Sequence, residues 1–551
     1  MSKNAKNESL LLGDEAVGFA AIDAGLTGIF GYPGTPSTEV FEAVEAEFKK
    51  NGVANRVARW AANEKVGYEF ALGCSYIGKR SMVTMKHVGL NVAMDPFVNS
   101  AITGVNGGLV VVVADDPGMH SSQNEQDSRY LADFANLPCL EPSTPQEAYD
   151  FTTYAFELSE KLRLPVLLRL VTRLAHTRGV VARQEMKEPT DLGIPNSESR
   201  FNWVLIPSNA RLQYQRLRDN FGQLLEAADD FNKFKKGDRR GVVVSGMGKA
   251  NFDQLCKEEA TISKFSKLEV MAYPLNDSLI DKMLESCDEI YIFEENYPYI
   301  EDKFIAKTRQ TKIRGRRDGT LNIAGELDPG VLRQALKLSM PEKKKGPTID
   351  LPARPPRMCD GCGHIDAYNA MKEAFNIIGV SDPRVFGDIG CYTLGAQPPF
   401  EGIDTCVEMG ASLGMALGAA MSGQVPSVGV IGDSTFFHSG LPTLISLVES
   451  KVNANFVIMD NRITAMTGQQ EVVATDIIPQ LAQAAGLLPE QVHILTPLPK
   501  KHEENVKKLV EIFKNNRPDL IIFKRDCIQA MRKGLYAKIN EEKKAGGHGH
   551  E

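Results

Sequence analysis

Long apolar stretches are scarce in this sequence of 551 residues. The longest run, residues 109–114, falls far short of the roughly 20 apolar residues that a membrane-spanning helix needs. The first residues, MSKNAKNESLLLGDEA, contain no apolar core of the kind that signal peptides carry. We therefore expect a cytoplasmic protein without a membrane segment.

Basic clusters and a regular cysteine framework are missing as well. The formal net charge is -7 and no Lys/Arg-rich block occurs, which argues against a nucleic-acid-binding surface. Nine cysteines, an odd number, are spread over the chain without the spacing of a disulfide scaffold. Five of them stand in or beside apolar segments and are expected to be buried: Cys74, Cys139, Cys256, Cys287 and Cys406.

Alternating helical and strand patterns predict an α/β protein with several domains. Residues 1–185 and 357–540 are each expected to form a doubly wound domain with a parallel sheet. Between them we expect a connector at 186–240 and a smaller α/β domain at 241–340. Five prolines between positions 341 and 356 predict a linker, and the Gly/His-rich residues 541–551 predict a flexible tail.

The most informative motif is a Gly-Asp-Ser at 432–434 that is followed by Asp-Asn at 460–461. The first part comes directly after an apolar strand pattern at 428–431, and the second directly after another at 455–459. In open α/β sheets, the carboxyl ends of such strands border the crevice that holds ligands. The motif therefore predicts oxygen ligands from two strand ends in one crevice.

This layout resembles the GDG...NN motif with which thiamine diphosphate enzymes hold Mg2+ on the cofactor's diphosphate. Asp433, Asn461 and the backbone carbonyl of Ile463 would be the protein ligands, which suits an ion that takes further ligands from phosphate and water. Ser434 replaces the second Gly of the motif and Asp460 replaces the first Asn. Strand-end Asp and Asn residues are also common turn formers, so the spacing alone leaves both interpretations open.

Glu64 would supply the second half of such a site. The cofactor's aminopyrimidine must exchange a proton during activation, which requires a carboxylic acid in a buried setting. Glu64 opens a predicted helix at 64–76, behind a strand-like segment at 56–60, and this position resembles the Asn-Glu helix start of pyrimidine-binding domains. The plainer interpretation is that Glu64 only favours the N-terminus of its helix.

Five segments carry a more specific resemblance: 31–37 (GYPGTPS), 85–91 (MKHVGLN), 114–120 (ADDPGMH), 387–392 (GDIGCY) and 432–440 (GDSTFFHSG). They resemble the alpha subunits of indolepyruvate:ferredoxin oxidoreductases, over nearly the whole chain and in the same domain order. The resemblance implies a pyrimidine-binding domain at 1–185, a transketolase-C-terminal-like domain at 241–340 and a diphosphate-binding domain at 357–540. In this family, a 2-oxoacid is decarboxylated on thiamine diphosphate, oxidised and released to coenzyme A, while electrons leave through iron-sulfur clusters.

The resemblance also implies roles for single residues. Thr35 matches the threonine of the family's YPxTP segment, which lies close to the substrate. Lys86 and His87 are candidates for binding the substrate carboxylate and for acid-base work, although His87 could be a plain hydrogen-bonded loop histidine. The remaining cofactor-binding candidates are Gly390, Cys391, Gly432, Ser434, His438 and Met466; for His438, capping the helix that it begins is the alternative.

Four cysteines form a second candidate site. Cys359 and Cys362 stand at the entry to the last domain, Cys391 follows the next strand segment, and Cys527 follows the apolar strand 520–523. Zinc and a 4Fe-4S cluster each accept four thiolates, and spacing does not distinguish them. The positions resemble the cluster-binding cysteines in beta subunits of related oxidoreductases, so our hypothesis is a 4Fe-4S cluster. A zinc or thiol site with an ordinary core Cys527 is the alternative.

The family also implies partners. A coenzyme-A-contacting, gamma-like domain belongs to a smaller beta subunit, which we expect to pair with this chain in a hetero-oligomer. The family's alpha subunits commonly carry a C-terminal ferredoxin-like domain with CxxCxxCxxxCP runs, and no such run occurs here. We therefore expect electrons to pass to a ferredoxin or a separate iron-sulfur subunit.

Three functions remain open at this point. The favoured one is oxidation of an arylpyruvate such as indolepyruvate, although CDGCGH at 359–364 departs from the family's usual CPGCPH and leaves the 2-oxoacid undefined. The rivals are a non-oxidative thiamine-dependent decarboxylase or synthase, and a non-catalytic electron-transfer or scaffold subunit.

Overall fold

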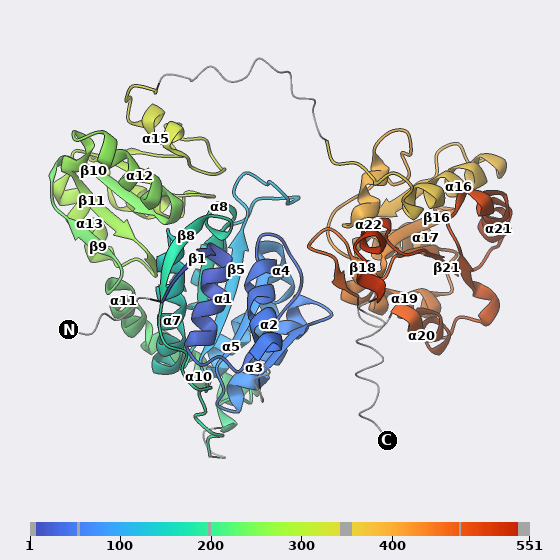
Figure 1. The fold of residues 1–551 in the computed structure, drawn as a ribbon, viewed down its shortest axis with the longest axis horizontal. Coiled ribbons are helices and arrows are strands. Elements are labelled where there is room, and N and C mark those ends of the chain that lie inside the picture. Colours follow the sequence, from blue (N-terminus) through green and yellow to red (C-terminus); the bar gives the residue numbers. More distant parts are fainter. Residues whose placement is uncertain (1–6, 52–55, 197–199, 342–354, 473–474, 538–551) are drawn as a thin grey trace. The chain divides into compact units, whose positions relative to one another are not determined.

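The computed structural model describes residues 7–51, 56–196, 200–341, 355–472 and 475–537, and it divides into two compact units, 1–345 and 346–551 (Figure 1). Most of the predicted linker at 341–356 and the whole predicted tail at 541–551 lie outside these described residues. Within them, no helix combines the length and the apolar character that crossing a bilayer requires.

The first unit is built on a seven-stranded sheet that is parallel except at one edge. From edge to edge the order is β12 (Ala272–Tyr273), β6 (Cys139–Leu140), β7 (Val166–Val171), β5 (Leu109–Asp115), β4 (Ser81–Lys86), β2 (Gly28–Gly31) and β3 (Val57–Trp60). Its three longest strands, β4, β5 and β7, are buried along their whole length, as expected where helices cover both faces of a sheet.

Eight helices follow or precede these strands along the chain, and α1 and α7 pack against each other. They are α1 (Gly13–Asp23), α2 (Thr38–Asn51), α3 (Glu64–Tyr76), α4 (His87–Val92), α5 (Met94–Thr103), α6 (Ser128–Ala135), α7 (Pro145–Leu162) and α8 (Thr172–Ala175). The predicted helix at 64–76 is confirmed as α3. A short antiparallel pair, β1 (Asn7–Leu12) with β8 (Arg178–Arg183), completes this part.

The smaller domain predicted at 241–340 is joined closely to the large sheet. Its own sheet has the order β14 (Lys312–Arg314), β13 (Glu289–Phe293), β10 (Asp238–Ser245), β11 (Phe265–Val270) and β9 (Lys233–Lys235), with β9 antiparallel. Helices α12 (Gly246–Glu258), α13 (Asp277–Ser286), α14 (Tyr299–Lys307) and α15 (Pro329–Ala335) accompany it. Helix α10 (Pro207–Asp219) instead packs against α5, and α11 (Phe221–Asp229) packs against α7 and β12 of the large sheet. Because β12 pairs with β6 in the large sheet, both sheets belong to one compact unit.

A fully buried ionic network holds these two sheets together. The guanidinium of Arg169 on β7 donates to Asp115 Oδ2 (2.7 Å) and Asn296 Oδ1 (2.6 Å), and it also pairs with Glu141. Arg129 pairs with Glu294 across 2.8 Å. Both arginine side chains are 0 % exposed. Since unpaired buried charges are costly, each guanidinium compensates several carboxylates at once.

Replacing Arg169 by Leu is expected to destabilise the first unit by about 3–5 kcal/mol, because Asp115 and Glu141 would remain buried without their cation. The measurement is the free energy of unfolding from denaturant titration. Arg239→Leu is the control, because its pair with Asp288 is 67 % exposed on both sides and should matter little. Equal losses in the two variants would contradict a special role of the network.

The second unit contains one parallel five-stranded sheet. Its order is β15 (Arg384–Gly387), β16 (Ser427–Gly432), β17 (Asn455–Asp460), β21 (Asp519–Lys524) and β20 (Val492–Leu495). The main helices are α16 (Gly363–Ile377), α17 (Ala411–Met421), α19 (Leu441–Ser450), α20 (Ile478–Ala484) and α21 (His502–Lys514), with a short α22 (Ile528–Arg532) (Figure 1). The chain is therefore an α/β protein with two doubly wound parallel-sheet domains, as the sequence predicts.

Candidate functional site

In the second unit, Asp433 joins the ends of β16 and β17. It is 3 % exposed and is the first residue of the short helix α18 (Asp433–Thr435). Its Oδ2 accepts hydrogen bonds from the backbone N–H groups of Asn461 (3.1 Å) and Arg462 (2.5 Å), and Oδ1 accepts one from the Ser434 N–H (2.8 Å). The structure thus brings the two halves of the Gly-Asp-Ser and Asp-Asn motif together at one edge of the sheet.

Asp460 places a second carboxyl group beside Asp433. Burial and the neighbouring Asp460 raise the pKa of Asp433 well above its usual range. Asp460 is 2 % exposed, and among the described residues its Oδ1 has no hydrogen-bond partner. Lys524 Nζ is 3.9 Å from its Oδ2. Two buried, adjacent carboxyls with an orphaned oxygen fit a site for a divalent cation, with Asn461 and the Ile463 carbonyl as neighbouring oxygen donors.

The loop after β15 lies against the same edge and owes its shape to Tyr392. A Cβ added at Gly390 would lie 2.3 Å from the Tyr392 ring, and one added at Gly432 would lie 2.7 Å from it, so both positions require glycine. The Tyr392 hydroxyl donates to the Asp388 carboxylate. Asp388 also accepts from Ser412 Oγ (2.7 Å), and burial raises its pKa to about 7. Asp388 and Tyr392 lie in the 387–392 segment but are not among the predicted site residues, although an Asp between glycines after a strand is a usable signal.

The four candidate cysteines are neighbours in this unit. Burial raises the pKa of the Cys391 thiol to about 12, and Cys362, Cys527, Cys359 and Asp433 each raise it further. Burial also raises the pKa of the Cys362 thiol, and the neighbouring Cys359 and Cys527 raise it further. Among the described residues, however, no three or more Cys, His, Asp or Glu side chains are arranged so that they could hold a metal ion as they stand. Four thiols therefore lie near one another, as a four-thiolate site requires, but they are not arranged as metal ligands in this structure.

Tyr536 connects the cysteine loop to the Asn461 loop. Its hydroxyl accepts a hydrogen bond from the Cys527 N–H (2.7 Å) and donates one to the Asn461 carbonyl (2.5 Å). Arg462 reinforces this link, because its guanidinium forms a double contact with Asp526 (2.8 and 2.7 Å) and lies 4.6 Å from the centre of the Tyr536 ring. Tyr536, Arg462 and Asp526 could not be recognised from the sequence, since their partners are remote along the chain.

On the motif's prediction that Asn461 is a metal ligand, Tyr536→Phe is expected to weaken the binding of thiamine diphosphate with Mg2+ about tenfold, the effect typical of removing a group that orients a metal ligand. Calorimetric titration of the cofactor measures it. The free energy of unfolding should fall by about 1–2 kcal/mol, because the Cys527 N–H and the Asn461 carbonyl lose their partner. Tyr214→Phe is the control, as that side chain is 49 % exposed. Unchanged cofactor affinity in Tyr536→Phe would show that the link has no bearing on the cofactor.

Two further candidates, His438 and Met466, lie in the same unit and differ in exposure. His438 is 4 % exposed and stands inside the π-helical turn Phe436–Gly440 that continues α18, so the alternative that it caps the helix is wrong. Met466 is 61 % exposed, between the two short strands β18 (Ile463–Thr464) and β19 (Gln470–Glu471). Of the five cysteines expected to be buried, Cys139 and Cys287 are buried, Cys74 and Cys256 are half-buried, and Cys406 is exposed, so the expectation is wrong for Cys406.

In the first unit, Glu64 lies beside the start of α4. Glu64 is 5 % exposed and begins α3, and the preceding Asn63 caps this helix by accepting the Val66 N–H (2.9 Å). A Cβ added at Gly89 on α4 would lie 2.6 Å from Glu64 Oε1, so glycine at this position makes room for the carboxyl group. Glu64 thus lies at the carboxyl edge of the sheet, next to the helix that carries His87.

Lys86 and His87 form the junction between β4 and α4. Burial lowers the pKa of Lys86 to about 8, against the opposing effect of Asp116, and its Nζ donates to the Ser121 carbonyl (2.7 Å). His87 is 1 % exposed, with Nε2 3.3 Å from Asn124 Oδ1. The loop that carries Thr35 lies close by, because a Cβ added at Gly34 would be 3.0 Å from Lys86 Cβ. The structure therefore gathers Thr35, Lys86 and His87 at one edge.

Asp116 and Asn124 belong to this edge but were missed in the sequence. Asp116 Oδ2 accepts from the Ser121 N–H (2.8 Å) and the Ser122 hydroxyl (2.6 Å), and these hydrogen bonds, with one from Thr172, lower its pKa despite burial. It thereby shapes the loop that supplies the carbonyl partner of Lys86. Its position directly after the apolar strand β5 was the available signal.

Two family profiles match separate parts of the chain. Residues 19–199 match the thiamine-diphosphate-binding domain of pyruvate flavodoxin/ferredoxin oxidoreductases, and residues 388–487 match the C-terminal TPP-binding domain of thiamine pyrophosphate enzymes. Together with the fold, these matches define a catalytic subunit of a thiamine-diphosphate-dependent 2-oxoacid:ferredoxin oxidoreductase.

Individual relatives identify the family. The chain is 37 % identical to the indolepyruvate oxidoreductase subunit IorA of Methanothermobacter thermautotrophicus, over 91 % of this chain and 84 % of that subunit. It is 34 % identical to the Pyrococcus horikoshii subunit IorA, over 98 % and 89 % of the two chains. The chain therefore belongs to the indolepyruvate oxidoreductase IorA family.

A more remote likeness is to the solved 2-oxoglutarate:ferredoxin oxidoreductase from Magnetococcus marinus, with 2-oxoglutarate, coenzyme A and succinyl-CoA bound. The TM-score is 0.49 at 18 % identity, over 61 % of this chain and 66 % of that chain.

Proposed function

We propose that this chain oxidatively decarboxylates an arylpyruvate such as indolepyruvate, with coenzyme A as acyl acceptor and a ferredoxin or separate iron-sulfur subunit as electron acceptor. The IorA relatives, named for indolepyruvate and as subunits, support the substrate class and a smaller beta subunit as partner in a hetero-oligomer. Thiamine diphosphate supplies the chemistry of 2-oxoacid decarboxylation, and a 4Fe-4S cluster supplies one-electron transfer.

One observation carries the oxidative part of this proposal. Cys391 is a neighbour both of Asp433, the proposed Mg2+ ligand, and of the three other candidate cysteines. Zinc has no redox chemistry, whereas an oxidation that uses one-electron acceptors needs a redox centre near the cofactor. We therefore assign Cys359, Cys362, Cys391 and Cys527 to a 4Fe-4S cluster.

The proposed tasks of the remaining residues follow from their surroundings. Asp433, Asn461 and the Ile463 carbonyl hold Mg2+, which binds the diphosphate. Glu64 exchanges a proton with the aminopyrimidine, for which a buried carboxylic acid is suited. Lys86 attracts the substrate carboxylate. The second-unit candidates Gly390, Gly432, Ser434, His438 and Met466 and the first-unit candidates Thr35 and His87 remain proposed contacts of cofactor or substrate.

Iron analysis of the anaerobically purified complex tests the function. We expect about four iron and four sulfide per chain, as one 4Fe-4S cluster requires, and reduction of viologen that depends on both an arylpyruvate and coenzyme A. Cys391→Ser should lose iron and this activity, while Cys256→Ser, at an unrelated cysteine of the first unit, should keep both. Absence of iron with an aldehyde or acyloin as product would establish the non-oxidative rival.

A further inference from the structure

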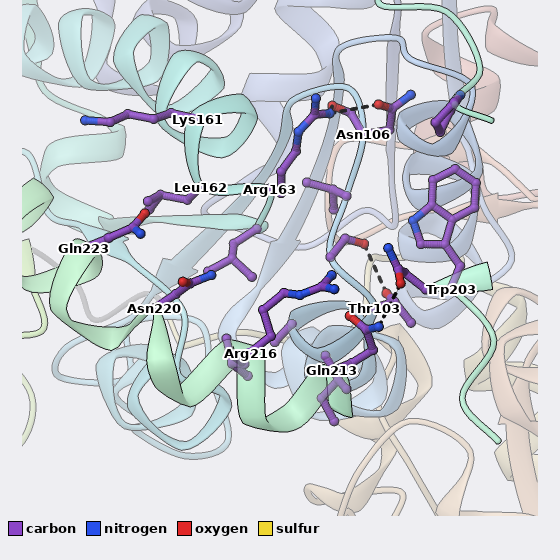
Figure 2. Close-up of a pocket in the computed structure, with 18 residues that line it drawn as sticks. Thr103, Asn106, Lys161, Leu162, Arg163, Trp203, Gln213, Arg216, Asn220 and Gln223 are labelled. Carbon is purple, nitrogen blue, oxygen red and sulfur yellow. Dashed lines mark hydrogen bonds between the residues drawn. The ribbon is translucent and has the colours of Figure 1, made fainter. Parts of the chain in front are cut away.

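The first unit contains a cavity of about 400 Å3 that is distant from the residues assigned so far. It is bounded by the end of α5, the turn 104–106, the end of α7 and one side of α10 (Figure 2). The turn precedes β5, and the end of α7 precedes β7, so the cavity lies at the amino edge of the large sheet. Lys86 and His87 lie at the carboxyl edge, and a strand as long as β5 separates the two edges by roughly 20 Å.

The cavity is basic although the whole chain is acidic. Its lining includes Lys161, Arg163 and Arg216 and no Asp or Glu, in a chain of formal net charge -7. Figure 2 shows the Arg216 guanidinium pointing into the space between Arg163 and Gln213. In the part of the chain that the structure describes, no ion pair involves the side chain of Arg216 or of Lys161. Among the described residues, the charges of Lys161 and Arg216 therefore have no carboxylate in salt-bridge contact.

Arg163 lines the cavity, and Asn106 holds its guanidinium in place (Figure 2). Arg163 ends α7 in the left-handed backbone conformation, and its Nη1 donates to both the carbonyl (2.9 Å) and the side-chain oxygen (2.8 Å) of Asn106. Asn106 is itself 6 % exposed and anchored through its Nδ2 to the Gly193 carbonyl (2.8 Å). Nη1 is thus occupied by the carbonyl and the side chain of Asn106, and within the described part of the chain Nε and Nη2 make no hydrogen bond. A guanidinium held in this way suits the planar, two-point binding of an oxyanion.

The rest of the lining is apolar or amidic. Leu162, Leu164 and Leu217 are buried and form an apolar floor, and Trp203 stacks on Tyr76 with ring centres 4.1 Å apart. Gln213 is 3 % exposed and donates to Asn202 Oδ1 (2.9 Å). The volume falls in the range of small-molecule sites, whose walls are mostly apolar with a few fixed polar groups.

We propose that this cavity is a second ligand site, which binds a small molecule with a carboxylate or phosphate group on an apolar or ring-shaped body. The oxyanion lies between Arg163 and Arg216, and the body lies over the apolar floor. This site is independent of the thiamine chemistry, because none of its lining residues belongs to the candidate cofactor or substrate residues.

Calorimetric titration of the purified chain with phenylacetate, adenosine 5′-monophosphate and inorganic phosphate tests the proposal. We expect at least one of these probes to bind, with an affinity that falls as salt is added, because the attraction is partly electrostatic. Phenylacetate and adenosine 5′-monophosphate distinguish a carboxylate from a phosphate ligand, and inorganic phosphate shows how far the anion alone suffices.

Variants of α10 locate the binding. Arg216→Ala should weaken the bound probe at least tenfold, and Arg216→Lys, which keeps the charge, should weaken it less. Arg218→Ala is the matched control: it removes the same charge from the same helix, but Arg218 donates to Asn136 (2.7 Å) and does not line the cavity. The proposal is overturned if no probe binds at millimolar concentration, or if Arg216→Ala and Arg218→Ala have equal effects.

Discussion

Replacing Glu64 by Gln is expected to lower 2-oxoacid-dependent reduction of viologen or ferredoxin by about 1,000-fold or more, while thiamine diphosphate still binds. Glutamine fills the same space beside Gly89 but cannot exchange a proton at this position, and general acid-base catalysis contributes about 100- to 10,000-fold. Glu64 is 5 % exposed, so its carboxyl group is largely shielded from bulk solvent. Steady-state rates and calorimetric cofactor titration together measure the two effects.

Glu69→Gln is the matched control for this experiment. Glu69 stands on the same helix, is exposed and pairs only with Lys65 one turn earlier among its described ion pairs, so its loss should leave rate and affinity unchanged. If Glu64→Gln retained full activity, the assignment of Glu64 would be wrong. If it lost cofactor binding and folding stability together, Glu64 would be a structural rather than a catalytic residue.

The longer strands could be predicted because they are continuous apolar runs. β5, β16, β17 and β21 are buried along almost their whole length, and such runs stand out between polar turns. The two-residue strand β12 could not be predicted, because two residues carry no periodicity and its pairing with β6 depends on chain segments more than 130 residues apart. For the same reason, the joining of both sheets of the first unit into one compact body was not visible in the sequence.

The candidate site was predictable to the extent that its residues follow strands. Asp433 and Asn461 come after β16 and β17, whose parallel pairing brings their carboxyl ends together. The contacts that orient these residues could not be predicted. Tyr536 and Asn461 are 75 positions apart in the sequence, and Arg462 and Asp526 are 64 positions apart. Such pairs depend on the complete tertiary structure and leave no local pattern.

Replacing Asp433 by Asn is expected to weaken the binding of thiamine diphosphate with Mg2+ at least about 100-fold, equivalent to about 2.8 kcal/mol. The variant removes the anionic oxygen that a hard divalent cation prefers. Asparagine still offers one oxygen to the N–H groups of Asn461 and Arg462, so the loops can keep their arrangement. Asp476→Asn is the control, since that carboxylate is 62 % exposed and pairs with Lys524.

A loss of cofactor binding in Asp433→Asn could mean that a metal ligand is lost or that the Asn461 loop is no longer anchored. The stability of the cofactor-free protein distinguishes these two explanations. Burial and the neighbouring Asp460 raise the pKa of Asp433 and so disfavour its charged form, and Asp433→Asn should therefore leave the cofactor-free Tm unchanged or higher. Added Mg2+ and thiamine diphosphate should raise the Tm of the wild type and of Asp476→Asn, but not that of Asp433→Asn. A lower cofactor-free Tm in Asp433→Asn would instead mean that this carboxylate mainly anchors the Asn461 loop. A full cofactor-induced rise in Tm would exclude Asp433 as a ligand, because binding that survives the loss of this charge does not depend on it.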